Sequence, residues 1–225
     1  MKIKNNIEIV SLHIPKTAGT SFRTILKDKI GDSRVVRLDI HNKNDIRLNE
    51  KAFTKDKLRN KIKVVHGHFK FADIKELFDL DPSVKYVTWL RDPVDRVLSH
   101  YYYLMKMAAI KMGEQAKDEI LSKVGKSLEE YVVHDQNRNE ISHFLEGSSF
   151  DDFDFIGIQK DFENELNRFR KVMGWSNIEN QRHNVTGSKK PAIDKKTVEL
   201  IKSYNEKDVE IYEEALKRHQ KIVNS

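Results

Sequence analysis

Residues with recognisable chemistry occur near the start of the chain, where the apolar run IEIV leads into LHIPKTAGTSF (residues 12–22). This segment joins one lysine and one glycine to three hydroxyl side chains. A strand, a tight loop of small and hydroxyl residues and then a helix can hold phosphate through backbone N–H groups. The residues alone therefore predict either an anion site or an ordinary strand-to-helix turn with a hydroxyl cap. The candidate anion-binding residues are Pro15, Lys16, Thr17, Ala18, Gly19, Thr20 and Ser21.

The lysine of this loop comes before the glycine, whereas the nucleotide-binding motif G-x-x-x-x-G-K-[ST] places it between glycine and hydroxyl. Lys16 is a mobile point charge, suited to an oxygen that gains negative charge during a reaction. Gly19 lets the backbone come close to a ligand.

A second segment, LRDPVDRVLSHYYY, places an arginine at the end of an apolar run. Arg91 offers a guanidinium fork suited to phosphate. Ser99 lies two turns into the helix that follows, where its hydroxyl can share the same anion. Asp92 is a natural N-cap of that helix and Pro93 a natural first residue. The alternative is structural, with Arg91 paired to Asp92 or Asp95 and Ser99 bonded back to its own helix.

The elements that position these residues alternate between strand and helix patterns. We expect strands at residues 7–14, 33–40, 62–69, 84–90 and 153–160, and helices at residues 20–30, 71–78, 94–112, 116–125, 161–175 and 195–223. Residues 43–61 are expected to form loop and helix, and residues 127–147 to be helical in pieces. This alternation predicts an α/β fold with a mainly parallel central sheet flanked by helices. In such sheets ligands bind outside the carboxyl ends of the strands, where both segments begin.

The composition suits one domain over residues 1–225 with a sizeable core. The formal net charge is +6, with an excess of basic residues in the first third of the chain, which indicates either an anionic ligand or partner near that region or a lysine-rich solvated surface. Aromatic residues do not interleave with the basic ones, so no nucleic-acid partner is expected. The sequence has no cysteine. We find no transmembrane segment and no signal peptide, and we expect a cytoplasmic location.

Together the two segments resemble the sulfotransferases that use 3′-phosphoadenosine 5′-phosphosulfate (PAPS). The resemblance is closest to the carbohydrate branch, which includes the heparan sulfate 2-O-sulfotransferases and many bacterial members. It implies a P-loop-like sulfotransferase fold, with the first segment on the 5′-phosphosulfate and with Arg91 and Ser99 on the 3′-phosphate. The segment NVTGSKKP resembles the loop that closes over the nucleotide, which implies a role for Lys189 and Lys190. No metal is implied, because lysine and backbone amides suffice for a sulfuryl group.

The segment HGH resembles the part of the family that carries its proposed catalytic base. A hydroxyl acceptor is a poor nucleophile near neutral pH and needs a base. His66 and His68 are two residues apart, so they share a face if the strand continues through both. We expect His68 to be the base and His66 to support it or to contact substrate. His13 precedes the loop and is a weaker candidate that would orient it.

The acceptor implied by the resemblance is a hydroxyl of a glycan or glycolipid, bound by a helical region at residues 101–150. A tyrosine and methionine stripe there can instead be core. Two other functions stay open, namely a phosphate-loop nucleotide kinase or NTPase and a non-catalytic nucleotide-binding module. The oligomeric state is not predicted. The candidate acceptor-binding residues are Tyr102, His134, Arg138 and His143.

Overall fold

The computed structural model describes residues 2–110, 127–175 and 193–223. The chain forms two compact units, Met1–Leu90 with His143–His183 and Arg91–Ser142 with Asn184–Ser225. The single domain expected over residues 1–225 stays a prediction, because these units are defined by contacts and not by independent folding. Lys189, Lys190 and the helix expected at residues 116–125 lie outside the described residues.

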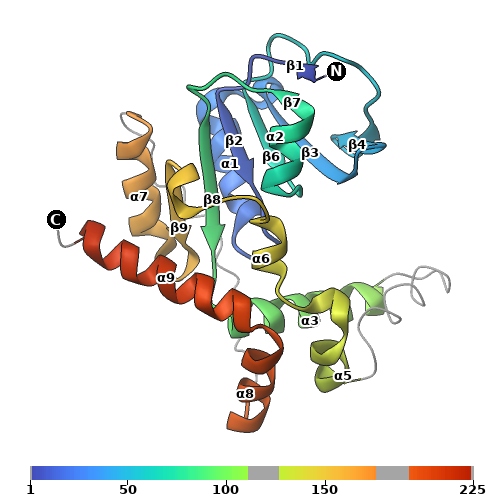
Figure 1. The fold of residues 1–225 in the computed structure, drawn as a ribbon, viewed down its shortest axis with the longest axis vertical. Helices are drawn as coiled ribbons and strands as arrows, with labels where there is room; N and C mark the ends of the chain where they lie inside the picture. The colour runs from blue at the N-terminus through green and yellow to red at the C-terminus, as the bar shows by residue number, and fades with distance from the viewer. Residues whose placement is uncertain (1, 111–126, 176–192, 224–225) are drawn as a thin grey trace. The chain divides into compact units, whose positions relative to one another are not determined.

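The first unit is built on a seven-stranded sheet of order β5-β4-β3-β6-β2-β8-β9 (Figure 1). Strands β3, β6, β2, β8 and β9 are parallel neighbours, and β4 and β5 add an antiparallel edge. The predicted α/β class with a mainly parallel sheet is therefore confirmed. Strands β1 (Ile3–Lys4) and β7 (Phe78–Asp79) form a separate parallel pair. The strands of the main sheet are β2 (Ile9–Leu12), β3 (Val35–Asn42), β4 (Asp45–Leu48), β5 (Lys51–Ala52), β6 (Val64–Gly67), β8 (Lys85–Leu90) and β9 (Phe155–Ile158).

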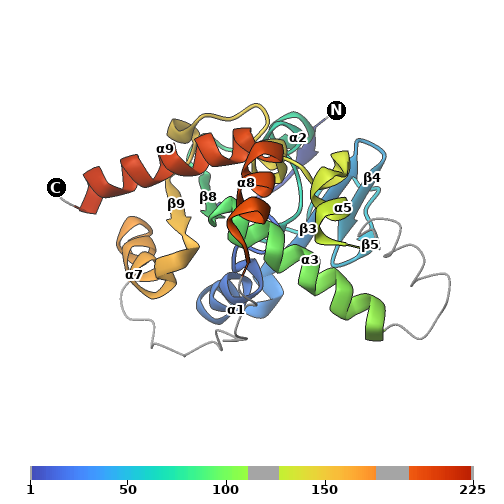
Figure 2. The same cartoon turned by 90° about the horizontal axis from the view of Figure 1, so that it is seen from below.

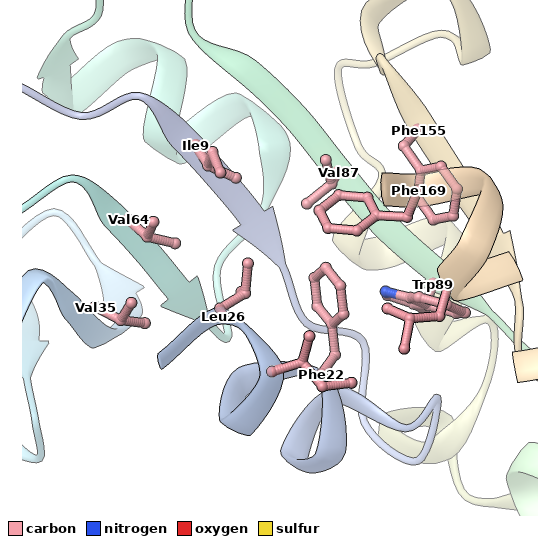
Figure 3. Packing of buried hydrophobic residues seen from close by; sticks show 11 residues of the cluster. Ile9, Phe22, Leu26, Val35, Val64, Val87, Trp89, Phe155 and Phe169 are labelled. Atoms are coloured by element: carbon pink, nitrogen blue, oxygen red, sulfur yellow. The ribbon is translucent and has the colours of Figure 1, made fainter. Parts of the chain in front are cut away.

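Helices cover both faces of this sheet, with α1 (Gly19–Ile30) and α7 (Phe162–Val172) on one face and α2 (Phe71–Leu77) on the other (Figures 1 and 2). Under α1 and α7 lies a cluster of aliphatic and aromatic side chains (Figure 3). Phe22 of α1 points between α7 and the sheet, with its ring 5.0 Å from that of Phe169 and 5.3 Å from that of Trp89. This packing fixes α1 against the sheet, and with it the loop that precedes α1.

The order of the strands places a topological switch point at the carboxyl ends of β2 and β8. These strands are neighbours, with Leu12 opposite Thr88, yet the chain continues from β2 to β3 on one side and from β8 to β9 on the other. Strand β6 flanks β2 on its other side, with Gly67 opposite Leu12. The three sequence motifs therefore follow three adjacent strands at the edge of the sheet where α/β proteins bind ligands.

The helix predicted within residues 43–61 is wrong, whereas part of the segment is loop as predicted. All of these residues are described, none is helical, and they include the hairpin of β4 and β5. Its two-residue turn has Asn49 at φ 48° and Glu50 at φ 69°, the left-handed pair that suits the twist of a hairpin. The buried side chain of Ile46 and the exposed Arg47 next to it follow the two-residue period of a strand.

The second unit is helical and contains α3 (Pro93–Ile110), α5 (Leu128–Val133), α8 (Lys195–Tyr204) and α9 (Glu206–Val223). The carboxylate of Asp92 accepts the N–H of Asp95 at 2.9 Å, which confirms the predicted N-cap. Within the described part of the chain, no helix has the length and apolar character needed to cross a membrane. The core of this unit consists of Val97, Leu98, Tyr131, Val132 and Ile201.

Candidate functional site

The loop between β2 and α1 has an unusual backbone. Lys16 has φ 70° and Ala18 has φ 74°, both in the left-handed region although both carry a β-carbon. This conformation costs about 1–2 kcal/mol per residue, and such strain is typically found at ligand sites. Left-handed residues that alternate with ordinary ones turn successive N–H groups toward a common concavity that binds anions. This backbone conformation suits an anion, as the sequence predicted for the loop.

The N-terminus of α1 is left uncapped in a way that suits an anion. Ala18 is the N-cap and provides no side-chain hydrogen bond, and the first turn has no acidic residue. The N–H of Phe22 donates to the carbonyl of Ala18 at 3.1 Å, so the N–H groups of Gly19, Thr20 and Ser21 come before the first N–H that bonds within the helix. These three donors and the positive end of the helix dipole favour negative charge at this point.

The side chains of the loop differ in exposure. The buried hydroxyl of Thr17 donates to the carbonyl of Ile14 at 2.8 Å and so closes the loop. Lys16 and Ser21 are half-buried, and Thr20 is exposed. The hydroxyl of Thr17 is thus used within the loop, whereas Lys16 and Ser21 are partly exposed and Thr20 is exposed.

His66 is a buried residue of β6. Its Nδ1 lies 2.8 Å from the hydroxyl of Ser11 on the neighbouring strand, and only 3% of the residue is exposed. Burial, together with the positive charge of Arg23, lowers the pKa of His66 to about 3. His66 is therefore neutral at any pH near 7 and has little access to a substrate.

His68 is half-buried and is held by three hydrogen bonds. Its Nδ1 lies 2.8 Å from the carbonyl oxygen of His13. Its backbone N–H donates to the carboxylate of Asp39 at 3.2 Å, and its carbonyl accepts from Ile40 at 2.9 Å. Because a carbonyl oxygen only accepts, Nδ1 must carry the proton and Nε2 must carry the lone pair. This tautomer is the one that a general base acting through Nε2 requires.

The environment of His68 keeps the imidazole neutral. Burial lowers its pKa, and the carboxylate of Asp39 opposes that shift. Asp39 is itself buried and forms an ion pair with Arg37 at 2.7 Å. We did not predict Asp39 or Ser11 from the sequence. Asp39 could have been noticed because it is a single carboxylate between two apolar residues at the end of the strand VVRLDI.

Arg91 and Ser99 belong to the second unit. Arg91 directly follows the last residue of β8, and Ser99 is a half-buried residue of α3. Burial lowers the pKa of the Arg91 guanidinium, and the carboxylates of Asp95 and Asp92 oppose this shift.

The candidate acceptor-binding residues are divided between the two units. Tyr102 is 39% exposed on α3, and His134 is exposed, both in the second unit. The guanidinium of Arg138 lies 4.4 Å from the ring of Tyr204, also in that unit.

His143 is exposed and belongs to the first unit. Its ring lies 5.7 Å from that of Phe144, and the ring of Phe144 lies 6.1 Å from that of His68. Of the four acceptor candidates, His143 is therefore the one that the structure brings into the unit of the proposed base.

Comparison with known proteins gives the following findings. A family model described as "Sulfotransferase family" matches residues 1–213. Heparan sulfate 2-O-sulfotransferase 1 of Cricetulus griseus is 31% identical over 111 residues, which cover 45% of this chain and 30% of that protein. The Homo sapiens protein of the same name is 28% identical over 111 residues, with the same two shares. The match thus spans under a third of these curated relatives. The crystal structure of mouse sulfotransferase SULT7A1 complexed with PAP aligns with 92% of this chain and 66% of that chain, at 13% identity and a TM-score of 0.44.

Proposed function

The chain belongs to the sulfotransferase family, and from that premise we propose that it moves the sulfuryl group of PAPS to a hydroxyl of a carbohydrate or glycoconjugate. The observation that carries the proposal is the hydrogen bond between Nδ1 of His68 and the carbonyl of His13. His13 is the first residue of the loop that follows β2, so this bond joins a base of defined tautomer to an anion-binding loop.

The loop residues fit the 5′-phosphosulfate of the donor. The left-handed conformations of Lys16 and Ala18 and the uncapped start of α1 supply backbone N–H donors, and the hydroxyls of Thr20 and Ser21 supply others. When bound, PAPS would supply an activated sulfuryl group. Lys16 would stabilise negative charge on the leaving oxygen. Arg91 and Ser99 would hold the 3′-phosphate, and Lys189 and Lys190 would add charge near the phosphates.

His68 would accept the proton of the acceptor hydroxyl at Nε2. The carbonyl of His13 keeps the other ring nitrogen protonated, and Asp39 holds the backbone of His68 in place. A neutral imidazole near pH 7 is in the form that can take this proton. His66 supports the arrangement from the interior, where Ser11 fixes its ring.

A carbohydrate acceptor is favoured because the relatives that match part of the chain are named heparan sulfate 2-O-sulfotransferases. We assign acceptor contacts to His143, close to the base through Phe144, and to Tyr102, His134 and Arg138. A kinase or NTPase is disfavoured because the lysine precedes the glycine of the loop and because the matching family is that of sulfotransferases.

The test is transfer of labelled sulfate from PAPS to a panel of glycans and glycolipids, with calorimetry of adenosine 3′,5′-bisphosphate (PAP) binding. We expect transfer to at least one hydroxyl acceptor, and much tighter binding of PAP than of AMP, because AMP lacks the 3′-phosphate. Binding without transfer to any acceptor would support a nucleotide-binding module. Magnesium-dependent ATP hydrolysis would support the kinase or NTPase alternative.

A further inference from the structure

Three histidine rings form a stack at the carboxyl ends of β2 and β6. The ring of His13 lies between the other two, with its centroid 4.9 Å from that of His66 and 4.5 Å from that of His68. The planes are nearly parallel, at 25° and 28°. These distances are within the range of stacked aromatic pairs. His13 therefore separates the buried imidazole from the half-buried one.

His13 also contacts the start of α1. A β-carbon added to Gly19 would lie 1.9 Å from Cδ2 of the His13 ring and 2.1 Å from its Nε2, so the ring fills the space where any other residue would place a side chain. The backbone of His13 is fixed as well, because its N–H donates to the carbonyl of Gly67 at 2.8 Å. One residue thus touches the helix start, the strand that carries the base and the base itself.

The stack is not arranged as a metal site, and it is uncharged. Within residues 2–110, 127–175 and 193–223, no group of three or more His, Asp or Glu side chains is placed to hold a metal ion. Burial holds the pKa of His13 well below its usual value, and the neighbouring His66 and His68 lower it further. Three neutral rings can stack without the repulsion that three imidazolium ions would suffer.

We propose that His13 is a positioning residue for the transfer reaction, which couples the anion-binding loop to the proton-accepting nitrogen of His68. This inference rests on the proposed function. The main-chain carbonyl of His13 selects the tautomer of His68, and its ring excludes water from one face of the His68 imidazole and sets its distance from Gly19. Movement of the loop on binding an anion is transmitted to His68 through this single residue.

The other groups around His68 do not replace this contact. Asp39, Arg37 and His41 act on His68 from β3, where Asp39 raises its pKa and Arg37 and His41 lower it. Phe144 of α6 (Glu140–Phe144) contributes a ring contact and no charge. The ring of His13 is the stacked neighbour at 4.5 Å, so its removal opens His68 to water. Since burial is the largest cause of the lowered pKa, added water must raise it.

The experiment follows the Cε1 proton of His68 by NMR as a function of pH, in the wild type, His13→Ala and His13→Phe. His13→Phe keeps a flat ring and the same main-chain carbonyl, whereas His13→Ala keeps only the carbonyl. We expect the titration midpoint of His68 to rise by at least about half a pH unit in His13→Ala and to change little in His13→Phe. If His13→Ala does not fold, His13→Val takes its place. His219→Ala is the matched control, because His219 lies on α9, away from these residues in sequence and in the other unit.

Kinetics provide the second readout. In His13→Ala the acid limb of the pH profile of kcat/KM should move to higher pH, as the NMR midpoint does. At neutral pH, kcat should fall about tenfold or more while PAP still binds. An unchanged midpoint for His68 in His13→Ala would overturn the inference. The titration needs no turnover, so a shifted midpoint in a protein that sulfates no acceptor would keep the action of the His13 ring on His68 and would reject the proposed function, and with it the role of His13 in transfer.

Discussion

The Nδ1 atom of His68 lies 2.8 Å from the main-chain oxygen of His13, so the tautomer of the proposed base is set by the first residue of the proposed anion-binding loop. Main-chain atoms cannot be removed by substitution, and the base therefore keeps its tautomer in any variant of His13 that folds. This separates two properties of the site. The tautomer depends on the backbone, and the pKa depends on side chains.

The role of Nε2 can be isolated with a matched pair of variants, His68→Asn and His68→Ala. The amide of asparagine can donate to the carbonyl of His13 in place of Nδ1, but it has no second basic nitrogen. We expect both variants to lose about 10²–10⁴-fold in kcat, since a general base contributes rate enhancement of that size. Calorimetry should show PAP affinity close to that of the wild type. Normal turnover in His68→Asn would exclude His68 as the base.

The loop strain predicts a stabilising substitution. At φ 74° Ala18 has a conformation that glycine adopts freely, so Ala18→Gly should remove about 1–2 kcal/mol of steric cost and lose roughly 0.5–1 kcal/mol to added freedom of the unfolded chain. We expect a net gain of about 0.5–1 kcal/mol in the free energy of unfolding, measured with urea. The control is Ala108→Gly in α3, where φ is helical and glycine should destabilise. A destabilised Ala18→Gly protein would contradict the left-handed conformation.

Gly19 is predicted to be intolerant of any side chain. In Gly19→Ala the new methyl group overlaps the His13 ring, so either the ring leaves its place between His66 and His68 or the start of α1 moves. Both movements disturb the base and the anion-binding N–H groups together. We expect weaker PAP binding and a lower kcat in the same variant, measured by calorimetry and sulfate transfer. The double variant Gly19→Ala with His13→Ala relieves the overlap and should recover PAP affinity. Failure of the second substitution to restore binding would show that the overlap is not the cause.

Much of this arrangement was predictable from residue types and spacing. The strand before the loop, helix α1 and strand β8 follow from apolar runs bounded by turn residues, and the N-cap of α3 follows from Asp92 and Pro93. These features are local, because neighbouring residues decide them.

The features that were not predicted depend on contacts between strands far apart in sequence. Strand β4 pairs with β3, which lies earlier in the chain, and the short period of Ile46 and Arg47 is too brief to identify the strand without that partner. The roles of Ser11 and Asp39 depend on which strands flank β6, since each faces a histidine of that segment from the neighbouring strand. The spacing of His66 and His68 predicted a shared face only if the strand continues through both, and β6 ends at Gly67. The position of His13 between their rings depends on the strand order.

The carboxylate of Asp39 predicts a pH effect opposite to that of His13→Ala. Asp39 raises the pKa of His68 against the effect of burial, so Asp39→Asn should lower it. The asparagine oxygen can still accept the N–H of His68, which keeps the backbone in place. We expect the acid limb of kcat/KM to move to lower pH and kcat at neutral pH to fall, because a weaker base accepts the proton less readily. A shift to higher pH would mean that the charge of Asp39 does not act on His68.

Burial of His66 predicts how stability depends on pH. Its pKa is about 3 in the folded protein and about 6.5 when the chain is unfolded, so protonation favours the unfolded state. The stability associated with neutral His66 is complete above about pH 6.5 and is lost as the pH falls toward 3, by roughly 1.4 kcal/mol per pH unit at most. His66→Asn removes this proton uptake while an amide remains to pair with the hydroxyl of Ser11. Urea unfolding at pH 7.0 and 5.5 should therefore show a smaller loss of stability for His66→Asn than for the wild type, with His219→Asn behaving as the wild type. Equal losses in all three proteins would mean that His66 takes up no proton on unfolding. The assignment of His66 as a neutral imidazole in the folded protein would then be wrong.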